Sequence, residues 1–130
     1  LLIVAARCPD DLRRRVADCA ELGLAALVEV HDEAEVEVAL RAGARVVGVN
    51  NRNLRTFEVD LATSERILPA LPAGVRGVAE SGIRTAAAAA RLRRAGAANL
   101  LVGEALVRAA DPGRLLAELS APLPPEPGAR

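Results

Sequence analysis

Five short apolar runs, each followed by a helix-like segment, constrain the fold of this chain more than any other feature. The runs are LLIVAA (1–6), ALVEVH (26–31), RVVGVN (45–50), VRGVAE (75–80) and NLLVGE (99–104), and their starts lie 19 to 30 residues apart. This spacing is typical of strand–helix units. Because the runs are mostly apolar at both alternating positions, they predict parallel strands that are buried on both faces.

The segments between the runs carry helix signals at their ends. Pro9 suits a first helical position. Asp32 and Glu35 have the spacing of a capping box, Thr85 can cap an alanine-rich helix, and Asp111 precedes the last helix. A glycine followed by the next strand recurs as ELGLAALVEV, RAGARVVGV and RAGAANLLVG, which indicates repeated units in one domain. The expected helices cover residues 9–23, 32–43, 60–71, 85–96 and 111–119.

Two architectures fit this alternating order: a five-stranded doubly wound sheet, or the latter part of an eight-stranded (β/α)8 barrel. A barrel of that kind usually needs about 250 residues, and the chain has 130. The start directly on a strand favours part of a barrel, in the α/β class, over residues 1–120. The last segment, APLPPEPGAR (121–130), holds four prolines and is predicted to be a disordered tail.

Composition excludes several classes of function. The 17 basic residues balance 17 acidic ones, which argues against nucleic acid or an anionic membrane as the main partner. All the basic residues are arginine, so a reaction that needs lysine cannot run on this chain alone. Phe57 is the single aromatic residue, so the chain has no platform for stacking bases.

Cysteine and histidine are equally sparse. Two thiols, Cys8 and Cys19, and one imidazole, His31, do not make a structural zinc site, which usually needs four ligands. Free cysteines and the lack of a signal peptide predict a cytoplasmic protein. No apolar run approaches the roughly 18 residues that a membrane span needs.

Polar residues concentrate where the apolar runs end. Glu29 lies in the second run, Asn50 ends the third, and Glu80 and Ser81 end the fourth. Active sites of parallel α/β sheets lie at this carboxyl end of the strands. A carboxylate inside an apolar run is costly to bury without a task or a partner, so Glu29 either acts in a reaction or pairs with a neighbouring arginine.

Glycines mark the turns after the last two runs. Gly82 follows Glu80–Ser81, and Gly103 precedes Glu104. Paired turns of this kind match the phosphate site of many barrels, where main-chain amides donate to phosphate oxygens. Each turn alone is also compatible with an ordinary connection.

Four stretches together resemble one family: LVEVHD, GVNNRNLRTFEVDL, VAESGI and NLLVGEALVRAADP. Over residues 1 to about 120 the chain resembles indole-3-glycerol-phosphate synthase. The resemblance implies the fourth to eighth units of a (β/α)8 barrel. It also implies a carboxy-lyase of tryptophan biosynthesis that converts 1-(2-carboxyphenylamino)-1-deoxyribulose 5-phosphate into indole-3-glycerol phosphate, with neither a metal nor an organic cofactor.

The resemblance implies catalytic and substrate-binding roles for five residues. Glu29 matches the base that takes a proton during dehydration, and Asn50 matches the asparagine that orients substrate hydroxyls. Glu80 and Ser81 match a pair that holds the polar centre of the substrate. Arg52 matches an arginine on the substrate side of its loop.

The phosphate cradle of the family matches the main-chain amides of Gly82, Gly103 and Glu104. Some relatives have serine in place of Glu104, which is compatible with a role for the amide alone.

The chain departs from the family by lacking the first three strands, and with them two catalytic lysines. The isolated chain is therefore expected to be inactive, either as a fragment or as half of a split enzyme. It is expected to self-associate or to pair with an N-terminal half-barrel. The alternatives are another phosphate-binding barrel enzyme, such as an isomerase of the same pathway, or a non-catalytic half-barrel that oligomerises.

Overall fold

Five parallel strands form a single sheet in the computed structural model, which describes residues 1–123. The α/β class and the strand–helix alternation are confirmed. The strands are β1 (Leu2–Ile3), β2 (Leu27–Val30), β3 (Val46–Asn50), β4 (Arg76–Glu80) and β5 (Asn99–Leu101). The α-helices are α1 (Pro9–Glu21), α2 (Glu33–Arg41), α3 (Ala62–Ile67), α4 (Ala86–Arg94), α5 (Glu104–Arg108) and α6 (Pro112–Ser120).

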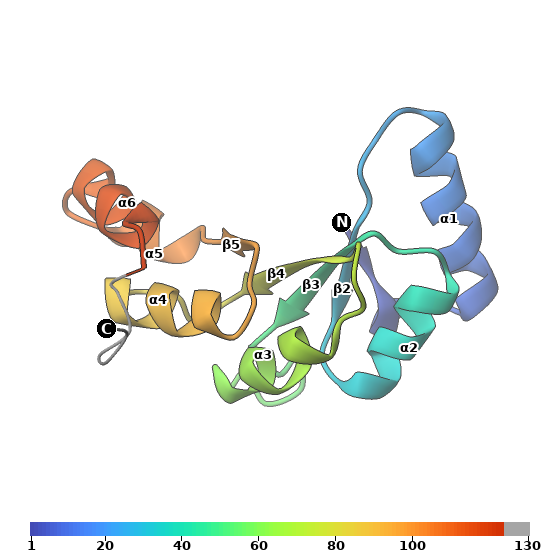
Figure 1. The fold of residues 1–130 in the computed structure, drawn as a ribbon, viewed down its shortest axis with the longest axis horizontal. Helices are drawn as coiled ribbons and strands as arrows, with labels where there is room; N and C mark the ends of the chain where they lie inside the picture. The colour runs from blue at the N-terminus through green and yellow to red at the C-terminus, as the bar shows by residue number, and fades with distance from the viewer. Residues whose placement is uncertain (124–130) are drawn as a thin grey trace, which may run out of the picture.

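Strand order decides between the two expected architectures. The strands lie in the order β1-β2-β3-β4-β5, so each is paired with its neighbours in sequence. A doubly wound sheet reverses its order at a switch point, whereas a (β/α)8 barrel adds each strand next to the previous one. In Figure 1 the helices accordingly follow one another around the sheet, from α1 and α2 through α3 to α4, α5 and α6. The fold is a partial (β/α)8 barrel of five units.

One face of the sheet forms the core beneath the helices. Alternate residues of the central strands point to this face, and the helices contribute apolar side chains that are equally buried. The set includes Val28, Val30, Val47, Val49 and Ala79 from the strands and Leu12, Ile67 and Leu92 from the helices. A continuous apolar layer therefore fixes the helices to the outside of the sheet.

The opposite face is only partly covered, so burial of the strands on both faces is wrong for the edge strand β5 and for the start of β4. Arg76 at the start of β4 and Asn99 in β5 are exposed, and Leu101 is 48% exposed. The carboxyl ends of β2, β3 and β4 are nevertheless buried on this face, where the predicted site residues lie.

Three elements differ from the sequence prediction. The first run is a strand only at Leu2–Ile3 and continues as a 3-10 turn over Val4–Ala6. The helix expected over 60–71 is shorter, because Pro69 lacks an N–H and the chain tightens into a 3-10 turn at Leu68–Ala70. The helix α5 was not predicted, since five residues carry too little periodicity to be recognised.

Helix capping follows the prediction with one exception. The side chains of Asp32, Thr85 and Asp111 each accept a hydrogen bond from the backbone N–H three residues further on. The capping box at Asp32 is not reciprocal, because the Glu35 carboxylate accepts from the backbone N–H of His31 at 2.8 Å instead. Glu35 is thereby drawn towards the strand end.

The helix α6 ends at Ser120, which is the last residue of the predicted domain. Most of the predicted tail, 124–130, lies outside the described residues, so the division into domain and tail stays a prediction. Among the described residues, no helix is long and apolar enough to cross a membrane.

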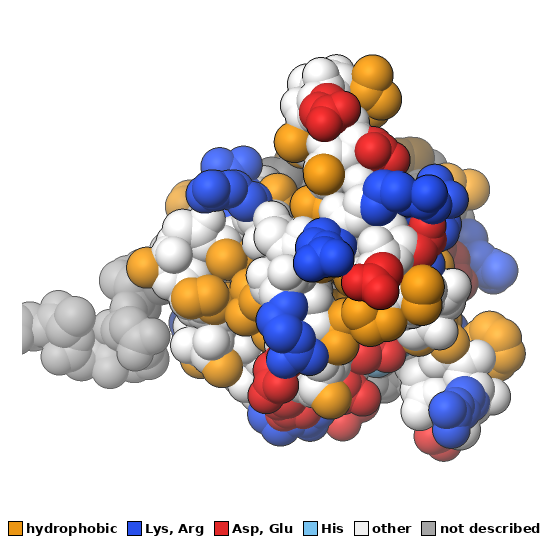
Figure 2. Space-filling model, turned by 90° about the vertical axis from the view of Figure 1, so that its right-hand side faces the viewer, with side chains coloured by type: hydrophobic (Ala, Val, Ile, Leu, Met, Phe, Trp, Pro, Cys, Tyr) orange, Lys and Arg blue, Asp and Glu red, His pale blue; other side chains and the backbone are white. Residues whose placement is uncertain are grey.

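Charges of both signs are interspersed on the face that α1 and α2 present (Figure 2). Asp11 illustrates the pattern, since its carboxylate lies 2.8 Å from Arg7, 2.8 Å from Arg14 and 3.1 Å from Arg15. Hydrogen bonds from these guanidinium groups, that of Arg7 first, hold the pKa of Asp11 well below its usual range. One carboxylate is thus shared by three guanidinium groups.

Candidate functional site

The register of the central strands brings the predicted site residues onto one face. Glu29 is paired with Gly48 in the register of β2 and β3, and Asn50 with Glu80 in that of β3 and β4. Registered residues of neighbouring parallel strands point to the same face, opposite the helices. The three polar side chains therefore share the carboxyl edge of the open face, as the sequence predicts.

Glu29 is held in a buried polar network. The Nδ2 of Asn50 donates to Oε1 of Glu29 at 3.0 Å, and Nε2 of His31 lies 3.3 Å from the same oxygen. Glu29 is 5% exposed and Asn50 is 8% exposed. The alternative interpretation, an ion pair between Glu29 and an arginine, is not what the described residues show.

Asn50 also organises the loop that follows its strand. Its Oδ1 accepts from the backbone N–H of Arg52 at 2.9 Å. One amide side chain thus links the proposed base to the loop that carries the arginine.

Glu80 is the most unusual group of the site. Its carboxyl group is buried, and Oε1 has no hydrogen-bond partner among the described residues. Burial, and then the nearby carboxylate of Glu29, raise the pKa of Glu80 to about 7. A carboxyl group with this pKa can hold or release a proton near neutral pH.

Gly48 makes room for Glu80, a relation that sequence reasoning missed. A Cβ on Gly48 would lie 1.8 Å from Oε1 of Glu80, so the carboxyl group keeps its position above β3 because residue 48 is glycine. A glycine within a valine-rich strand is the signal that could have indicated a close approach.

Asn51 fixes the backbone after β4 and was also assigned no role from sequence. Its Nδ2 donates to the carbonyl oxygens of Glu80 at 2.9 Å and Ser81 at 3.2 Å. Its Oδ1 accepts from the backbone N–H of Ser64 at 3.1 Å. This buried amide therefore ties the ends of β3 and β4 to α3.

The turn after β4 has a left-handed backbone. Ser81 has φ 65° and Gly82 has φ 78°. A Cβ on Gly82 would lie 2.4 Å from Cγ1 of Val59, so both the dihedral angle and the space favour glycine there. The turn leads the chain along the edge of a pocket.

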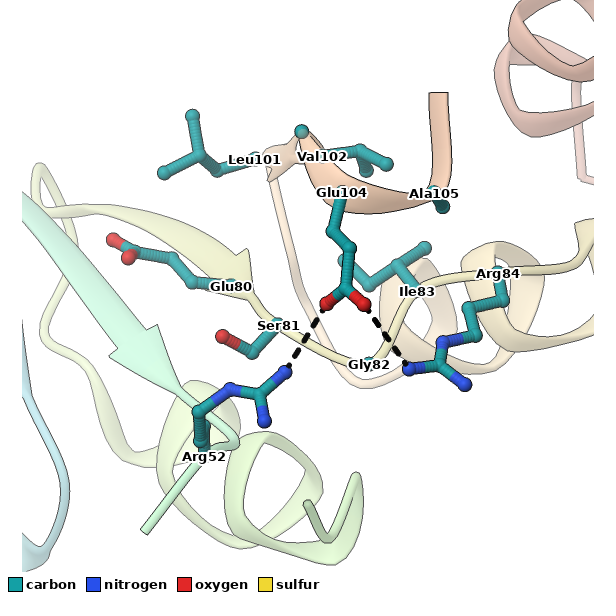
Figure 3. A pocket seen from close by; sticks show the side chains of 11 residues that line it. Arg52, Glu80, Ser81, Gly82, Ile83, Arg84, Leu101, Val102, Glu104 and Ala105 are labelled. Atoms are coloured by element: carbon teal, nitrogen blue, oxygen red, sulfur yellow. Dashed lines mark hydrogen bonds and ion pairs between the residues drawn. The ribbon is translucent and has the colours of Figure 1, made fainter. Parts of the chain in front are cut away.

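That pocket, of about 390 Å³, brings together six of the eight predicted site residues (Figure 3). These six are Arg52, Glu80, Ser81, Gly82, Gly103 and Glu104. Asn50 instead lines a second pocket of about 500 Å³, with His31, Glu35 and the shared residue Arg52. Glu29 lines neither of these two pockets and belongs to the buried network.

The first pocket contains an ion cluster that the sequence did not predict. The Glu104 carboxylate lies 3.4 Å from Nη2 of Arg52 and 3.9 Å from Nη2 of Arg84, between the two guanidinium groups in Figure 3. The Glu80 side chain is directed away from this cluster, towards β3. The site therefore has a buried acid–base part and a more exposed part that suits anions.

The described residues hold no group of three or more His, Cys, Asp or Glu placed to bind a metal ion. The chemistry available to these side chains is proton transfer by two carboxyl groups and binding of an anion by guanidinium and amide donors.

The fold and the site together define a member of the (β/α)8-barrel proteins whose functional groups lie at the carboxyl ends of the strands. Solved structures agree with this class. A chain of the Amycolatopsis orientalis BexX/CysO complex matches 90% of this chain and 52% of its own with a TM-score of 0.62 and 25% identity. The native KDPGal structure matches 87% of this chain and 51% of its own with a TM-score of 0.61, at 21% identity.

Sequence comparison defines the family. The profile of the family Indole-3-glycerol phosphate synthase matches residues 1–119, and the chain belongs to this family. Indole-3-glycerol phosphate synthase of Ruminiclostridium cellulolyticum is 50% identical over 92% of the chain, and that of an Exiguobacterium species is 52% identical over 92%. The chain spans 46% and 47% of these relatives, about half of their length.

Proposed function

We propose that this chain supplies the base, the second carboxyl group and the phosphate-binding part of an indole-3-glycerol-phosphate synthase. The reaction closes the indole ring of 1-(2-carboxyphenylamino)-1-deoxyribulose 5-phosphate and releases carbon dioxide and water. The observation that carries the proposal is the placement of two buried carboxyl groups, Glu29 and Glu80, beside an arginine-lined pocket at one edge of the sheet. The membership of the chain in the synthase family supports it.

Glu29 is the proposed base of the dehydration phase. Its hydrogen bond from Asn50 fixes one oxygen and leaves the carboxylate facing the open side of the sheet. Asn50 orients substrate hydroxyls close to this base. Glu80 and Ser81 hold the polar centre of the substrate, and the pKa of Glu80 near 7 suits a group that exchanges protons with a neighbour.

The phosphate is proposed to bind in the 390 Å³ pocket. The amides of Gly82, Gly103 and Glu104 and the guanidinium of Arg52 line it, and such donors suit phosphate oxygens. Because the Glu104 carboxylate pairs with Arg52, it must release this arginine when a phosphate enters. The side chain of Glu104 thus competes with the phosphate for Arg52, while the backbone amide of Glu104 donates to the phosphate.

Three further strand–helix units are part of the proposal. The open face of the sheet, with Leu101 48% exposed at the β5 edge, needs a cover of further strands. The family resemblance assigns the two catalytic lysines to those units. These units lie either on the same polypeptide or on a partner, in the cytoplasm. In their absence the chain associates with itself.

Complementation tests the function directly. The chain alone should show no synthase activity, because it contains no lysine. Mixing it with a separately produced N-terminal half, which carries strands one to three, should restore indole formation measured by fluorescence. An active chain without the added half would contradict the proposal. A stable homodimer that never gains activity with the N-terminal half would instead support a non-catalytic half-barrel.

Phosphate binding can be tested on the chain alone. Addition of inorganic phosphate should shift the amide signals of Gly82, Gly103 and Glu104 in the nuclear magnetic resonance spectrum. The amide of Gly23, at the opposite end of the fold, is the internal control. Shifts elsewhere without shifts at the three amides would refute this part of the assignment.

A further inference from the structure

His31 lies beside the proposed base, and each of its two ring nitrogens lies close to a carboxylate. It follows β2, and its side chain is 17% exposed. Its Nδ1 lies 3.0 Å from Oε2 of Glu35, and its Nε2 lies 3.3 Å from Oε1 of Glu29. One imidazole therefore bridges two carboxylates that come from β2 and from the first turn of α2.

The contacts of Glu35 determine which ring nitrogen carries the proton. Oε2 of Glu35 also accepts a hydrogen bond from the backbone N–H of His31 at 2.8 Å. An ionised carboxylate only accepts hydrogen bonds, so Nδ1 must be the donor to Glu35. The imidazole is fixed with a proton on Nδ1.

The other nitrogen then faces the base. Nε2 of His31 is buried and has no hydrogen-bond partner of good geometry among the described residues. With Nδ1 protonated, a neutral ring would place an acceptor 3.3 Å from the acceptor Oε1 of Glu29. A proton that Glu29 takes up can enter between the two atoms, and this removes the conflict.

Glu35 connects this arrangement to solvent. It is 20% exposed on its side chain and lines the pocket of about 500 Å³ together with His31. The charged groups that line this pocket beside His31 are Asp32, Glu35, Arg52, Arg55, Glu58 and Asp60. The imidazole of His31 therefore lies between the buried base and a group that lines an open pocket.

We propose that His31 and Glu35 form a proton relay that holds the proton taken up by Glu29. The proton leaves the substrate for Oε1 of Glu29 and passes to Nε2 of His31. The ring then carries a proton on both nitrogens beside the Glu35 carboxylate, and the return of the Nε2 proton through Glu29 restores each group without any other reactant. His31 and Glu35 act through Glu29 and do not touch the substrate. The relay rests on the proposed role of Glu29 as a base.

The first test is the protonation of the ring in the chain itself. Because His31 is the single histidine, its two ring nitrogens give unambiguous ¹⁵N signals. We expect the proton on Nδ1 in the unsubstituted chain, and loss of this preference in Glu35→Gln. The matched control is Glu37→Gln on the same helix, since Glu37 is exposed and pairs with Arg41. A neutral ring protonated on Nε2 in the unsubstituted chain would overturn the relay.

The second test uses the barrel completed by the N-terminal half. His31→Ala should lower kcat about 100-fold with little change in KM, and added imidazole should restore part of the turnover. Full activity of His31→Ala, or a loss that imidazole does not relieve, would overturn the relay. Glu29→Gln separates the two proposals: it should be inactive with or without imidazole, and an active Glu29→Gln would instead refute the proposed base.

Discussion

The ends of β2 and β3 and the ends of β4 and β5 hold their polar groups in different ways. At the first pair, Glu29 receives a hydrogen bond from Asn50 and has His31 beside it. At the second pair, Glu80 is buried with one oxygen unpartnered, and Glu104 occupies the arginine pocket. The carboxylate of the first region thus has a hydrogen-bond partner within the chain, whereas the second region contains groups that suit contacts from outside it.

The difference indicates that the two regions have different roles in the site. A carboxylate whose oxygen accepts a hydrogen bond from a buried amide has a fixed position, as a base requires. A carboxyl group that is buried without a partner has a raised pKa, and an ion cluster at a pocket mouth can exchange one anion for another. Four predictions test this division, from the largest expected effect to the smallest.

Glu29→Gln removes the proposed base from the first region. In the barrel completed by the N-terminal half, turnover should fall about 10²–10⁴-fold with little change in KM, because the amide keeps the shape but cannot accept the proton. Indole fluorescence under steady-state conditions measures both constants. Glu37→Gln serves as the control, and turnover of Glu29→Gln close to the unsubstituted level would place the base elsewhere.

Glu80 should make the stability of the chain depend on pH. Its folded pKa is raised to about 7 from the ordinary 4.5, mainly by burial, so between these values the folded state keeps a proton that the unfolded state releases. The free energy of unfolding should therefore fall as the pH rises from 4.5 to 7, by about 3 kcal/mol. Urea unfolding at several pH values measures it.

The control for this pH dependence is the exposed Glu21. Glu80→Gln should flatten the profile between pH 4.5 and 7, and Glu21→Gln should leave it unchanged. A flat profile in the unsubstituted chain would show that Glu80 is ionised in the folded state at ordinary pH, and would remove the contrast between the two regions.

Gly48→Ala tests whether the space above β3 is needed for Glu80. The added Cβ would lie 1.8 Å from Oε1 of Glu80, so the carboxyl group must move, and unfolding should require about 1–3 kcal/mol less free energy. Gly103→Ala is the matched control, since its Cβ would have no neighbour within 4 Å, and it should cost less than about 1 kcal/mol. Equal effects of the two substitutions would contradict the close packing of Glu80.

Removal of a helix cap should lower the free energy of unfolding by the same amount in the two regions. Asp32 caps α2 beside the first region, and Thr85 caps α4 beside the second. Asp32→Ala and Thr85→Ala should each lower the free energy of unfolding by about 1 kcal/mol, because each leaves a backbone N–H without its acceptor. A much larger loss for Asp32→Ala would show that this cap also supports the contacts of Glu35 with His31.

The sequence by itself determined the elements and the edge of the sheet where the site lies. Strand runs, caps and glycine stops act over a few residues, so their periodicity and spacing predict β2, β3, β4 and the helices between them. Because the carboxyl ends of parallel strands share one edge, Glu29, Asn50 and Glu80 could be placed there from their positions alone. Pro69 could have shortened the predicted third helix, since its effect is equally local.

Only the tertiary structure decided how these groups interact. Strand order selected the barrel, and the pairing of β2, β3 and β4 placed Glu80 over Gly48, which is 32 residues earlier in the chain. The ion pair of Arg52 with Glu104 likewise joins residues far apart in sequence. Such contacts depend on burial and on distances across strands, and a linear pattern carries neither. For this reason the raised pKa of Glu80 and the bridge from Glu29 through His31 to Glu35 follow from the folded chain alone.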